Sequence, residues 1–533
     1  MKTARRIIAM LLTLCALLTL CACATTPKDN DATTGTTKPA ATSDTTKSTQ
    51  ATEPAFTPQP LKALVLYNSS VGDYNDETAN PVLTYIKEAT GYEITYDVLP
   101  SDSPYDKVNG ILASGTYYDF IVIKDKDYYT KYASWGALLD MKALVEQYAP
   151  NVAANITDTA ASILTIGDTY YAIPNMSPSG REDSANVSYG MMFRSDVLDT
   201  LGKTAPKTTE EFTELLRAFK KQDPFGAGAE IAPFTTYSSM LDNLRSSGIG
   251  GAFGVAYEWI DDNGTLVPYQ MTDGFVDYLN YLHGLYAEGL IDLEMPTNTS
   301  STVTSKFTSG KSVSAMFAYW SVPGLMKTFA ETDANAKLSY GTPLSGKSEG
   351  IAVTDSKNTI GSYVVVPLCA KDNVANIMEF FNRMADPEIF KGVALGEENV
   401  DYVVNADGSY SPLDAFFEHR NTANEYLTGT TADYGKYWLA RAQKNADQYA
   451  AYCQLNFDNA SFVRVDPVSE VPCDVFCNIA DARALSKTLT RDFMVVAIVE
   501  GVTDERIAQF RDDWKLQCGD ELTTALNEWY QSK

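Results

Sequence analysis

The sequence has few histidines and few positive charges. Two of its 533 residues are histidines, and most histidine-based metal sites and acid–base mechanisms require more. Lysine and arginine number 42 against 68 aspartates and glutamates, which gives a formal net charge of −26. A protein that binds the phosphate backbone of a nucleic acid needs the opposite sign, so the composition argues against a nucleic-acid partner.

Long apolar stretches are also rare, and one stands out at the start of the chain. Residues 7–22 form an apolar run of 16 residues behind a positively charged beginning. A bilayer-spanning helix needs about 20 residues, whereas a signal peptide has a core of this length. The run ends in Leu-Cys-Ala-Cys at residues 20–23, which resembles a bacterial lipobox and nominates Cys23 as the lipidated residue. The alternative is cleavage to a soluble secreted protein.

The stretch that follows is nearly free of aromatic side chains. Residues 24–60 contain 12 threonines, and Phe56 is their only aromatic residue. Such a composition cannot bury enough apolar surface to fold, and a flexible chain of this length reaches on the order of 30 Å. We therefore expect a signal peptide at residues 1–22 and, at 23–60, a disordered tether that begins with the lipidated Cys23.

The cysteines do not form the pattern of a small disulfide-rich protein. Besides Cys23, the mature chain holds five cysteines, an odd number that is widely scattered. Cys473 and Cys477 are four residues apart and could meet on a helix, and a disulfide between them is left open. A metal site there is disfavoured, because no histidine is near and the C-x-x-C spacing is absent.

The folded body begins with a pattern of strands and helices that alternate. Residues 62–67, 92–99 and 119–123 are predicted strands, and 81–90 and 103–114 are predicted helices between them. This order predicts βαβ units and a parallel sheet. The carboxyl ends of such strands meet at a crevice where ligands bind.

Several segments match the residue pattern of a catalytic or metal-binding motif without the structural context that the motif needs. Residues 341–348 match the P-loop pattern and 346–350 match a nucleophile elbow, with His419 as the only histidine later in the chain. Both motifs need a strand before them and a helix after them, and the sequence predicts no helix there. Residues 223–230 follow a helix as a calcium loop would, but Phe225 and Ala227 stand where oxygen ligands are required.

Longer segments carry a more specific signal. Residues 189–198 read Tyr-Gly-Met-Met-Phe-Arg-Ser-Asp-Val-Leu, and Pro-Lys-Thr-Thr-Glu-Glu-Phe follows at 206–212. Further segments with the same character lie at 136–141, 148–151, 167–175, 286–292, 307–311, 316–320 and 396–402. In this order they resemble the bacterial extracellular solute-binding protein family 1, the lipoprotein receptors of sugar-importing ABC transporters. Within that family the chain is most similar to the larger lipoproteins of the LplA type.

The resemblance implies an α/β fold, a two-lobed periplasmic-binding-protein-like clamshell of type II. Each lobe is expected to be a sheet flanked by helices. The expected first lobe comprises residues 61–175 and about 305–370, and the expected second lobe comprises about 176–304 and 371–533. The departure at 223–230 removes any inherited calcium site, and neither a metal nor another cofactor is expected.

The implied function is capture and delivery, without catalysis. The protein is expected to be a monomer held by its lipid on the extracytoplasmic face of the cell membrane. It would bind a carbohydrate, in particular an oligosaccharide, and pass it to the transmembrane subunits of an ABC permease. Two alternatives remain open, a surface carbohydrate-active hydrolase and a ligand-binding receptor for a sensor. Peptides, alditols and sugar acids also remain open as ligands.

The expected ligand-binding residues follow strand ends that face the cleft. Aromatic rings cover the C–H faces of sugars, while Asp, Asn, Arg and Lys bond their hydroxyl groups. The candidates are Tyr67, Asn68, Lys124, Asp125, Asn175, Arg194, Tyr319 and Trp320.

Overall fold

The computed structural model describes residues 57–68, 70–100 and 103–533. The predicted signal peptide, Cys23 and the tether as far as residue 56 lie outside the described residues. Within the described part, no helix is long and apolar enough to cross a membrane.

The first lobe is built on a five-stranded sheet with the strand order β2-β1-β3-β12-β4. The first three strands are parallel, as the alternation of strands and helices predicts, whereas β12 runs antiparallel to both β3 and β4. The helix between β1 and β2 ends at Gly91, whose φ of 76° is a left-handed conformation that glycine adopts without strain. The strands are β1 (Leu61–Val65), β2 (Ile94–Val98), β3 (Phe120–Ile123), β4 (Ile173–Met176) and β12 (Ile360–Val365).

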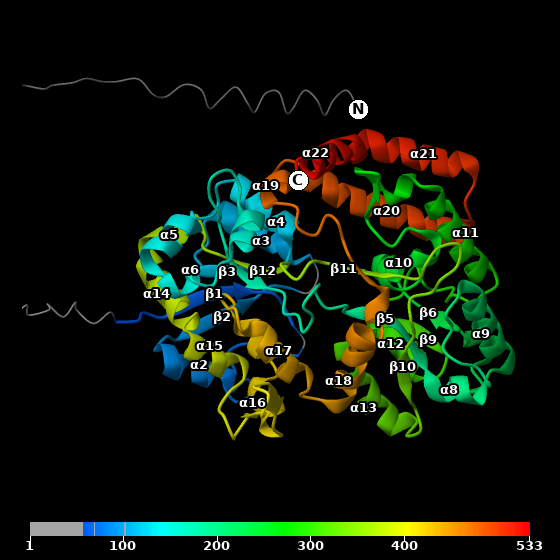
Figure 1. Cartoon of the computed structure of the whole chain (residues 1–533), viewed down its shortest axis with the longest axis horizontal. Coiled ribbons are helices and arrows are strands. Elements are labelled where there is room, and N and C mark those ends of the chain that lie inside the picture. Colours follow the sequence, from blue (N-terminus) through cyan, green and yellow to red (C-terminus); the bar gives the residue numbers. More distant parts are fainter. Residues whose placement is uncertain (1–56, 69, 101–102) are drawn as a thin grey trace, which may run out of the picture. The chain divides into compact units, whose positions relative to one another are not determined.

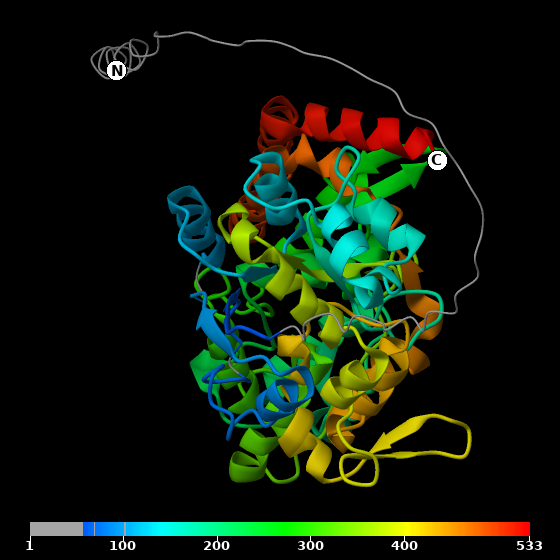
Figure 2. The same cartoon turned by 90° about the vertical axis from the view of Figure 1, so that its left-hand side faces the viewer.

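Helices from two parts of the chain cover this sheet and share its core. Phe380 packs against Tyr92 and Phe381 packs against Phe120, with ring centroids 5.2 and 5.4 Å apart. The helices of the first lobe are α2 (Val82–Thr90), α3 (Pro104–Ser114), α4 (Lys126–Ser134), α5 (Met141–Tyr148), α6 (Pro150–Ala153), α7 (Asp158–Leu164), α14 (Val374–Met384), α15 (Pro387–Ala394), α16 (Ala415–Arg420) and α17 (Tyr434–Ala442). The hairpin of β13 (Tyr402–Val404) and β14 (Tyr410–Pro412) extends beside them (Figure 2).

The second lobe is built on a four-stranded sheet with the strand order β10-β5-β9-β6. Its strands are β5 (Tyr189–Arg194), β6 (Phe234–Thr235), β9 (Ser314–Ala318) and β10 (Leu338–Tyr340). Its helices are α8 (Ser195–Thr200), α9 (Thr209–Gln222), α10 (Leu241–Ser247), α11 (Asp273–Ala287), α12 (Ser300–Thr308), α13 (Val322–Thr332) and α18 (Ala446–Cys453). A hairpin of β7 (Trp259–Asp262) and β8 (Thr265–Pro268) completes the lobe.

The lobes divide the chain differently from the sequence prediction. Strand β9, at 314–318, pairs inside the second sheet, although 305–370 was expected in the first lobe. Helices α14 to α17 pack into the first core, although 371–533 was expected in the second lobe. The apolar run of β9 and the amphipathic pattern of α14 identify a strand and a helix, but neither pattern specifies which sheet the element joins.

The chain crosses between the two sheets several times. It leaves the first lobe after β4, returns between β10 and β12, and leaves again between α17 and α18. A further segment leads from α18 to α19, which packs on α4 of the first lobe. This segment contains β15 (Val463–Val465), which pairs in parallel with β11 (Ala352–Thr354) of the second crossing, and Figure 1 shows β11 between the lobes. These crossings are the connections at which the lobes can move relative to each other.

The C-terminal helices contact both lobes. Helix α20 (Ala480–Glu500) packs against α11 of the second lobe and α4 of the first. Asp127 on α4 pairs with Arg483 and Lys487 on α20, at 2.9 and 3.2 Å. Figure 1 shows this group, in orange and red, along one side of the lobes. Its other members are α19 (Cys473–Cys477), α21 (Asp504–Trp514) and α22 (Asp520–Gln531).

The described cysteines are all unpaired. Cys473 and Cys477 lie together on α19, and both are free thiols. Burial raises the pKa of the Cys473 thiol to about 12, which keeps it protonated and unreactive at neutral pH.

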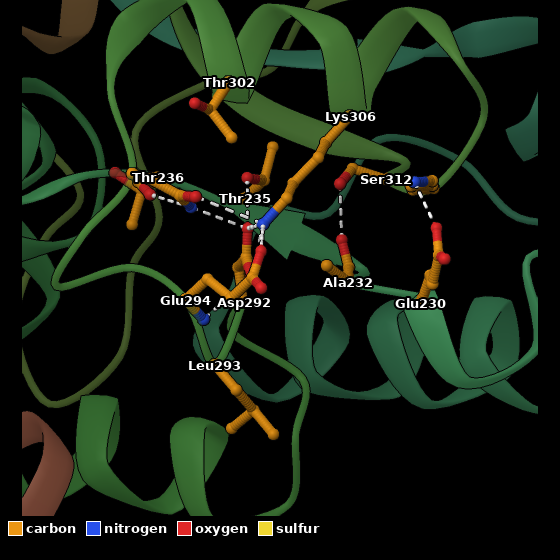
Figure 3. Close-up of polar contacts among 12 residues, drawn as sticks. Glu230, Ala232, Thr235, Thr236, Asp292, Leu293, Glu294, Thr302, Lys306 and Ser312 are labelled. Carbon is orange, nitrogen blue, oxygen red and sulfur yellow. Dashed lines mark hydrogen bonds and ion pairs between the residues drawn. The ribbon is translucent and has the colours of Figure 1, made fainter.

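A partly buried lysine connects elements of the second lobe (Figure 3). The ammonium of Lys306 on α12 donates to both carboxylate oxygens of Asp292, at 3.0 and 2.8 Å, and to Glu294, at 2.6 Å. Asp292 also accepts from Thr235 on β6 and from the amide of Asn298. These bonds tie α12 and the 292–298 loop to the edge of the sheet.

Candidate functional site: a groove between the lobes

Two adjoining cavities lie between the lobes and share three aromatic residues. The inner cavity has a volume of about 490 Å³ and the outer cavity about 470 Å³. Tyr319, Trp320 and Trp438 line both. The two cavities therefore form one continuous groove with an aromatic constriction at its middle.

The aromatic constriction presents one broad exposed ring. Tyr319 is buried and packs edge-on against Tyr452, with ring centroids 5.2 Å apart. Trp320 packs edge-on against Tyr319 at 4.9 Å and against Tyr189 at 5.5 Å, and 48% of its surface stays exposed. The buried tyrosines thus hold an indole that is free to cover an apolar ligand face.

The inner cavity is bordered by segments that cross between the lobes. Its walls include residues 185–189 before and within β5, residues 353–355 around β11, and Asp466 after β15. Helix α10 supplies Asp242 and Arg245 from the second lobe. Arg245 is buried, pairs with Asp242 at 2.6 Å and donates to backbone carbonyls, so its charge is compensated inside the protein.

Carboxyl groups dominate the charge of the inner cavity. Asp242, Glu258, Asp355 and Asp466 all line it. Burial, together with repulsion from Glu258 and Asp355, raises the pKa of Asp466 to about 7. Burial likewise raises the pKa of Asp355. This wall can accept hydrogen bonds from several hydroxyl groups and disfavours an anion.

The outer cavity has a different character. It is lined by the residues after β1, by the 417–425 segment, by α17 and its end, and by Gln448 of α18. Its charged residues are Glu425, Arg441 and Lys444, all between the end of α16 and the start of α18. The second lobe contributes Pro323 beside the shared aromatic residues.

The structure brings three of the predicted ligand-binding residues to the groove. Tyr319 and Trp320 line both cavities, and Asn68 lines the outer one. Lys124 lies next to it, because its ammonium pairs with Glu425 of the outer cavity at 2.8 Å. Tyr67 is half-exposed and lines neither cavity.

The other three predicted residues hold the fold together. The carboxylate of Asp125 caps the start of α4 by accepting from two backbone amides. Asn175 is buried and donates to Ser362 and to the carbonyl of Leu427. Arg194 is fully buried.

Arg194 is paired with two aspartates inside the second lobe. Its guanidinium bonds Asp196 at 2.9 and 2.6 Å and Asp333 at 2.5 Å. The acid two residues further along the sequence was a local signal for this internal pairing.

The prediction from strand ends missed the residues that come from helices. Trp438, Arg441 and Lys444 enter the groove from α17 and the turn after it. Their spacing of three residues places them on one side of the helix, which is a readable signal. The carboxyl groups of the inner cavity come from four separate segments, and no local pattern links them.

The segments that resemble catalytic or calcium-binding motifs have structural roles instead. Residues 341–351 form a loop with no helix after it, and Lys347 pairs with Asp277 at 2.7 Å. The imidazole of His419 donates from Nδ1 to Asp401 Oδ1, 2.6 Å away and outside the groove. The carboxylate of Asp223 accepts from backbone amides of its own loop. No cluster of His, Cys, Asp and Glu in the described part is arranged to hold a metal ion.

Known proteins share both the sequence and the fold. A family model described as bacterial extracellular solute-binding protein matches residues 72–389, more than half of the chain. The chain is 23% identical over 482 residues to lipoprotein LipO of Bacillus subtilis strain 168, covering 85% of this chain and 89% of LipO. It is 21% identical over 454 residues to the polygalacturonan/rhamnogalacturonan-binding protein YtcQ of the same organism, covering 84% and 87%.

A solved structure has the same arrangement. The S. pneumoniae ABC-transporter substrate binding protein FusA in complex with kestose superimposes with a TM-score of 0.68 at 18% identity. The likeness covers 89% of this chain and 99% of the FusA chain. The predicted two-lobed α/β clamshell of type II is confirmed.

Proposed function

The chain belongs to the bacterial extracellular solute-binding protein family, and on this premise we propose that it captures an oligosaccharide in the groove between its lobes and delivers it to an ABC permease. Members of this family are substrate-binding proteins and not enzymes. In this proposal the protein is attached to the outer face of the membrane through a lipid on Cys23. Its groove is then the part that meets the ligand.

The exposed ring of Trp320 at the junction of the two cavities is the observation that carries this proposal. A pyranose or furanose ring presents C–H groups on its face, and an indole covers such a face. Trp438 lines both cavities, and its buried Nε1 has no hydrogen-bond partner in the described part of the chain. It is therefore an unsatisfied donor at the junction of the two cavities.

The size of the groove favours an oligosaccharide over a single sugar. Each cavity alone falls within the range of small-molecule sites, about 300–1,000 Å³. A ligand that fills both places at least one sugar on each side of Trp320. The names of YtcQ and FusA, which refer to a pectic polysaccharide and a fructooligosaccharide, support a carbohydrate as the ligand class.

Hinge closure explains how binding is signalled to a permease. Asn68 and Arg441 belong to the first lobe, and Trp320 and Pro323 belong to the second. A ligand that contacts both sets favours the closed arrangement of the lobes, because only that arrangement makes both contacts.

Calorimetric titration with mono-, di- and trisaccharides, alongside peptides, tests the proposal. We expect stoichiometric binding of an intact oligosaccharide, and stabilisation by about 2.7 kcal/mol at 100 times its dissociation constant. Trp320→Ala should weaken the binding at least tenfold. Trp135→Ala is the matched control, because Trp135 is equally exposed, at 52%, and lies outside both cavities.

Two results would overturn the proposed function. One is catalytic turnover of the oligosaccharide, which would make the protein a hydrolase. The other is tight binding of peptides with no response to any sugar.

A further inference from the structure

Two cations in the outer cavity have no carboxylate partner. Arg441 is 2% exposed, and its terminal nitrogens donate only to oxygens of uncharged groups, such as Asn424 Oδ1 at 2.8 Å. Its Nε has no hydrogen-bond partner in the described part of the chain. The ammonium of Lys444 bonds Asn421 Oδ1 at 2.5 Å. Neither cation forms an ion pair with any described residue.

The acid closest to them is already neutralised. Glu425 is the only acid among the described residues that line the outer cavity. One of its oxygens pairs with Lys124 at 2.8 Å, and the other accepts from Asn424 at 2.8 Å. Arg441 and Lys444 therefore leave an excess of positive charge in a chain whose net charge is −26.

Three other cations of low exposure are compensated, whereas Arg420, which is 7% exposed, also forms no ion pair with a described residue. Arg194 pairs with two aspartates, Arg245 with Asp242, and Lys306 with Asp292 and Glu294. A buried charge without such a partner is costly. The cost is visible at Lys444, where burial and then Arg441 lower the pKa from 10.5 to about 7. Burial lowers the pKa of Arg441 as well.

We propose that the outer cavity is an anion subsite, in which Lys444, beside the charge of Arg441, receives the carboxylate or sulfate of a sugar residue. This inference rests on the proposed function, since it assigns a charge to the carbohydrate in the groove. Lys444 donates one N–H to Asn421 and keeps two for charge-assisted hydrogen bonds to such a group, while Arg441, whose terminal N–H groups already donate within the protein, contributes its charge. The ligand's anion supplies the counter-charge that the protein itself omits.

The inner cavity restricts where the ligand carries its charge. Asp242, Glu258, Asp355 and Asp466 line that cavity, with Arg245 committed to Asp242. A second anion placed there would meet carboxyl groups, whereas neutral hydroxyls find acceptors. The ligand class is thus an oligosaccharide with one acidic residue at one end and neutral residues beyond Trp320.

Matched pairs of oligosaccharides test this inference. Each pair contains a neutral oligosaccharide and the same chain with one terminal uronate, and a further arm carries a terminal sulfate. Trigalacturonate, with a carboxylate on every unit, serves as the fully charged arm. We expect the singly acidic member to bind at least tenfold more tightly than its neutral counterpart and than trigalacturonate. The uronate and sulfate arms distinguish the two sources of the anion.

Variants of α17 and its end connect the preference to the named residues. Lys444→Met should remove most of the tenfold preference for the acidic member over its neutral counterpart, whereas Lys444→Arg should keep the preference. Lys436→Met is the matched control on the same helix, because Lys436 is exposed and pairs with Asp433 outside the groove. Arg441→Lys is a second variant, which keeps a positive charge at this buried position.

The possible outcomes distinguish failure of the anion subsite from failure of the proposed function. A neutral oligosaccharide as the tightest ligand, or an acidic preference that survives Lys444→Met, would overturn the anion subsite and leave sugar binding standing. Absence of binding by every sugar would overturn the proposed function itself, and the subsite with it.

Discussion

Replacing Lys444 by methionine should stabilise the ligand-free protein at neutral pH. Burial and Arg441 lower the pKa of Lys444 from 10.5 to about 7 in the folded state, whereas the unfolded chain keeps the ordinary value. Below pH 7 the ammonium is charged in both states, and the folded state carries the full cost of burying it. Methionine fills a similar volume without a charge and removes that cost.

The magnitude follows from the two pKa values. At about 1.4 kcal/mol per pH unit, the difference between 10.5 and about 7 sets an upper limit of about 5 kcal/mol below pH 7. Above pH 7 the folded state loses its proton first, so the advantage of the variant narrows by about 1.4 kcal/mol for each pH unit. It vanishes near pH 10.5, where the side chain is neutral in both states.

Urea unfolding of the wild type and Lys444→Met, measured in parallel between about pH 6 and pH 9, checks this prediction. The difference in unfolding free energy between the two proteins cancels the titration of all other groups. Lys436→Met should differ from the wild type by less than about 1 kcal/mol at every pH, because the exposed pair with Asp433 contributes little. A Lys444→Met variant that is no more stable than the wild type at pH 6, or whose gain does not change with pH, would refute the reasoning.

Three further predictions concern other parts of the chain. Lys306→Met should cost about 3–5 kcal/mol in urea unfolding, because it leaves the carboxylate of Asp292 buried without its cation, whereas Lys311→Met at the surface should cost less than about 1 kcal/mol. Asp466→Asn should raise the unfolding free energy above pH 7, where the folded wild type holds a buried carboxylate of raised pKa, and the gain should disappear as the pH falls below about 4. Cys23→Ser should release the protein from the membrane fraction or block its processing, and retention of the processed variant in membranes would contradict the lipid anchor.

The elements of the first lobe could be predicted where local pattern alone determines structure. The buried strand β3 is continuously apolar, and the helices before and after β2 end at glycines in left-handed conformations, which are local signals for the end of a helix. The assignment of β9 to a sheet could not be predicted in this way. Its five residues are all buried, so no alternation indicates the face or the neighbours of the strand.

The site was partly predictable for a similar reason. Asn68 and Trp320 follow directly on strands or their ends, and the rule that strand ends face the cleft placed them in the groove. Arg441 lies on α17 and Lys444 just after it, and this helix joins the first lobe more than 300 residues after β1. Their role depends on the absence of acids around them, which is a property of the folded neighbourhood and not of any short sequence.

The position of Lys444 connects the selection of a ligand to the movement of the lobes. It lies between α17, which packs in the first core, and α18, which packs in the second, so it belongs to a crossing segment. The inner cavity also uses crossing segments, at 353–355 and at Asp466. A ligand shifts the equilibrium between open and closed lobes only by the difference between its affinities for the two states. Contacts on the crossing segments change with the hinge, so an anion at Lys444 should contribute to that difference, and the neutral member of a matched pair should close the lobes less completely at saturation.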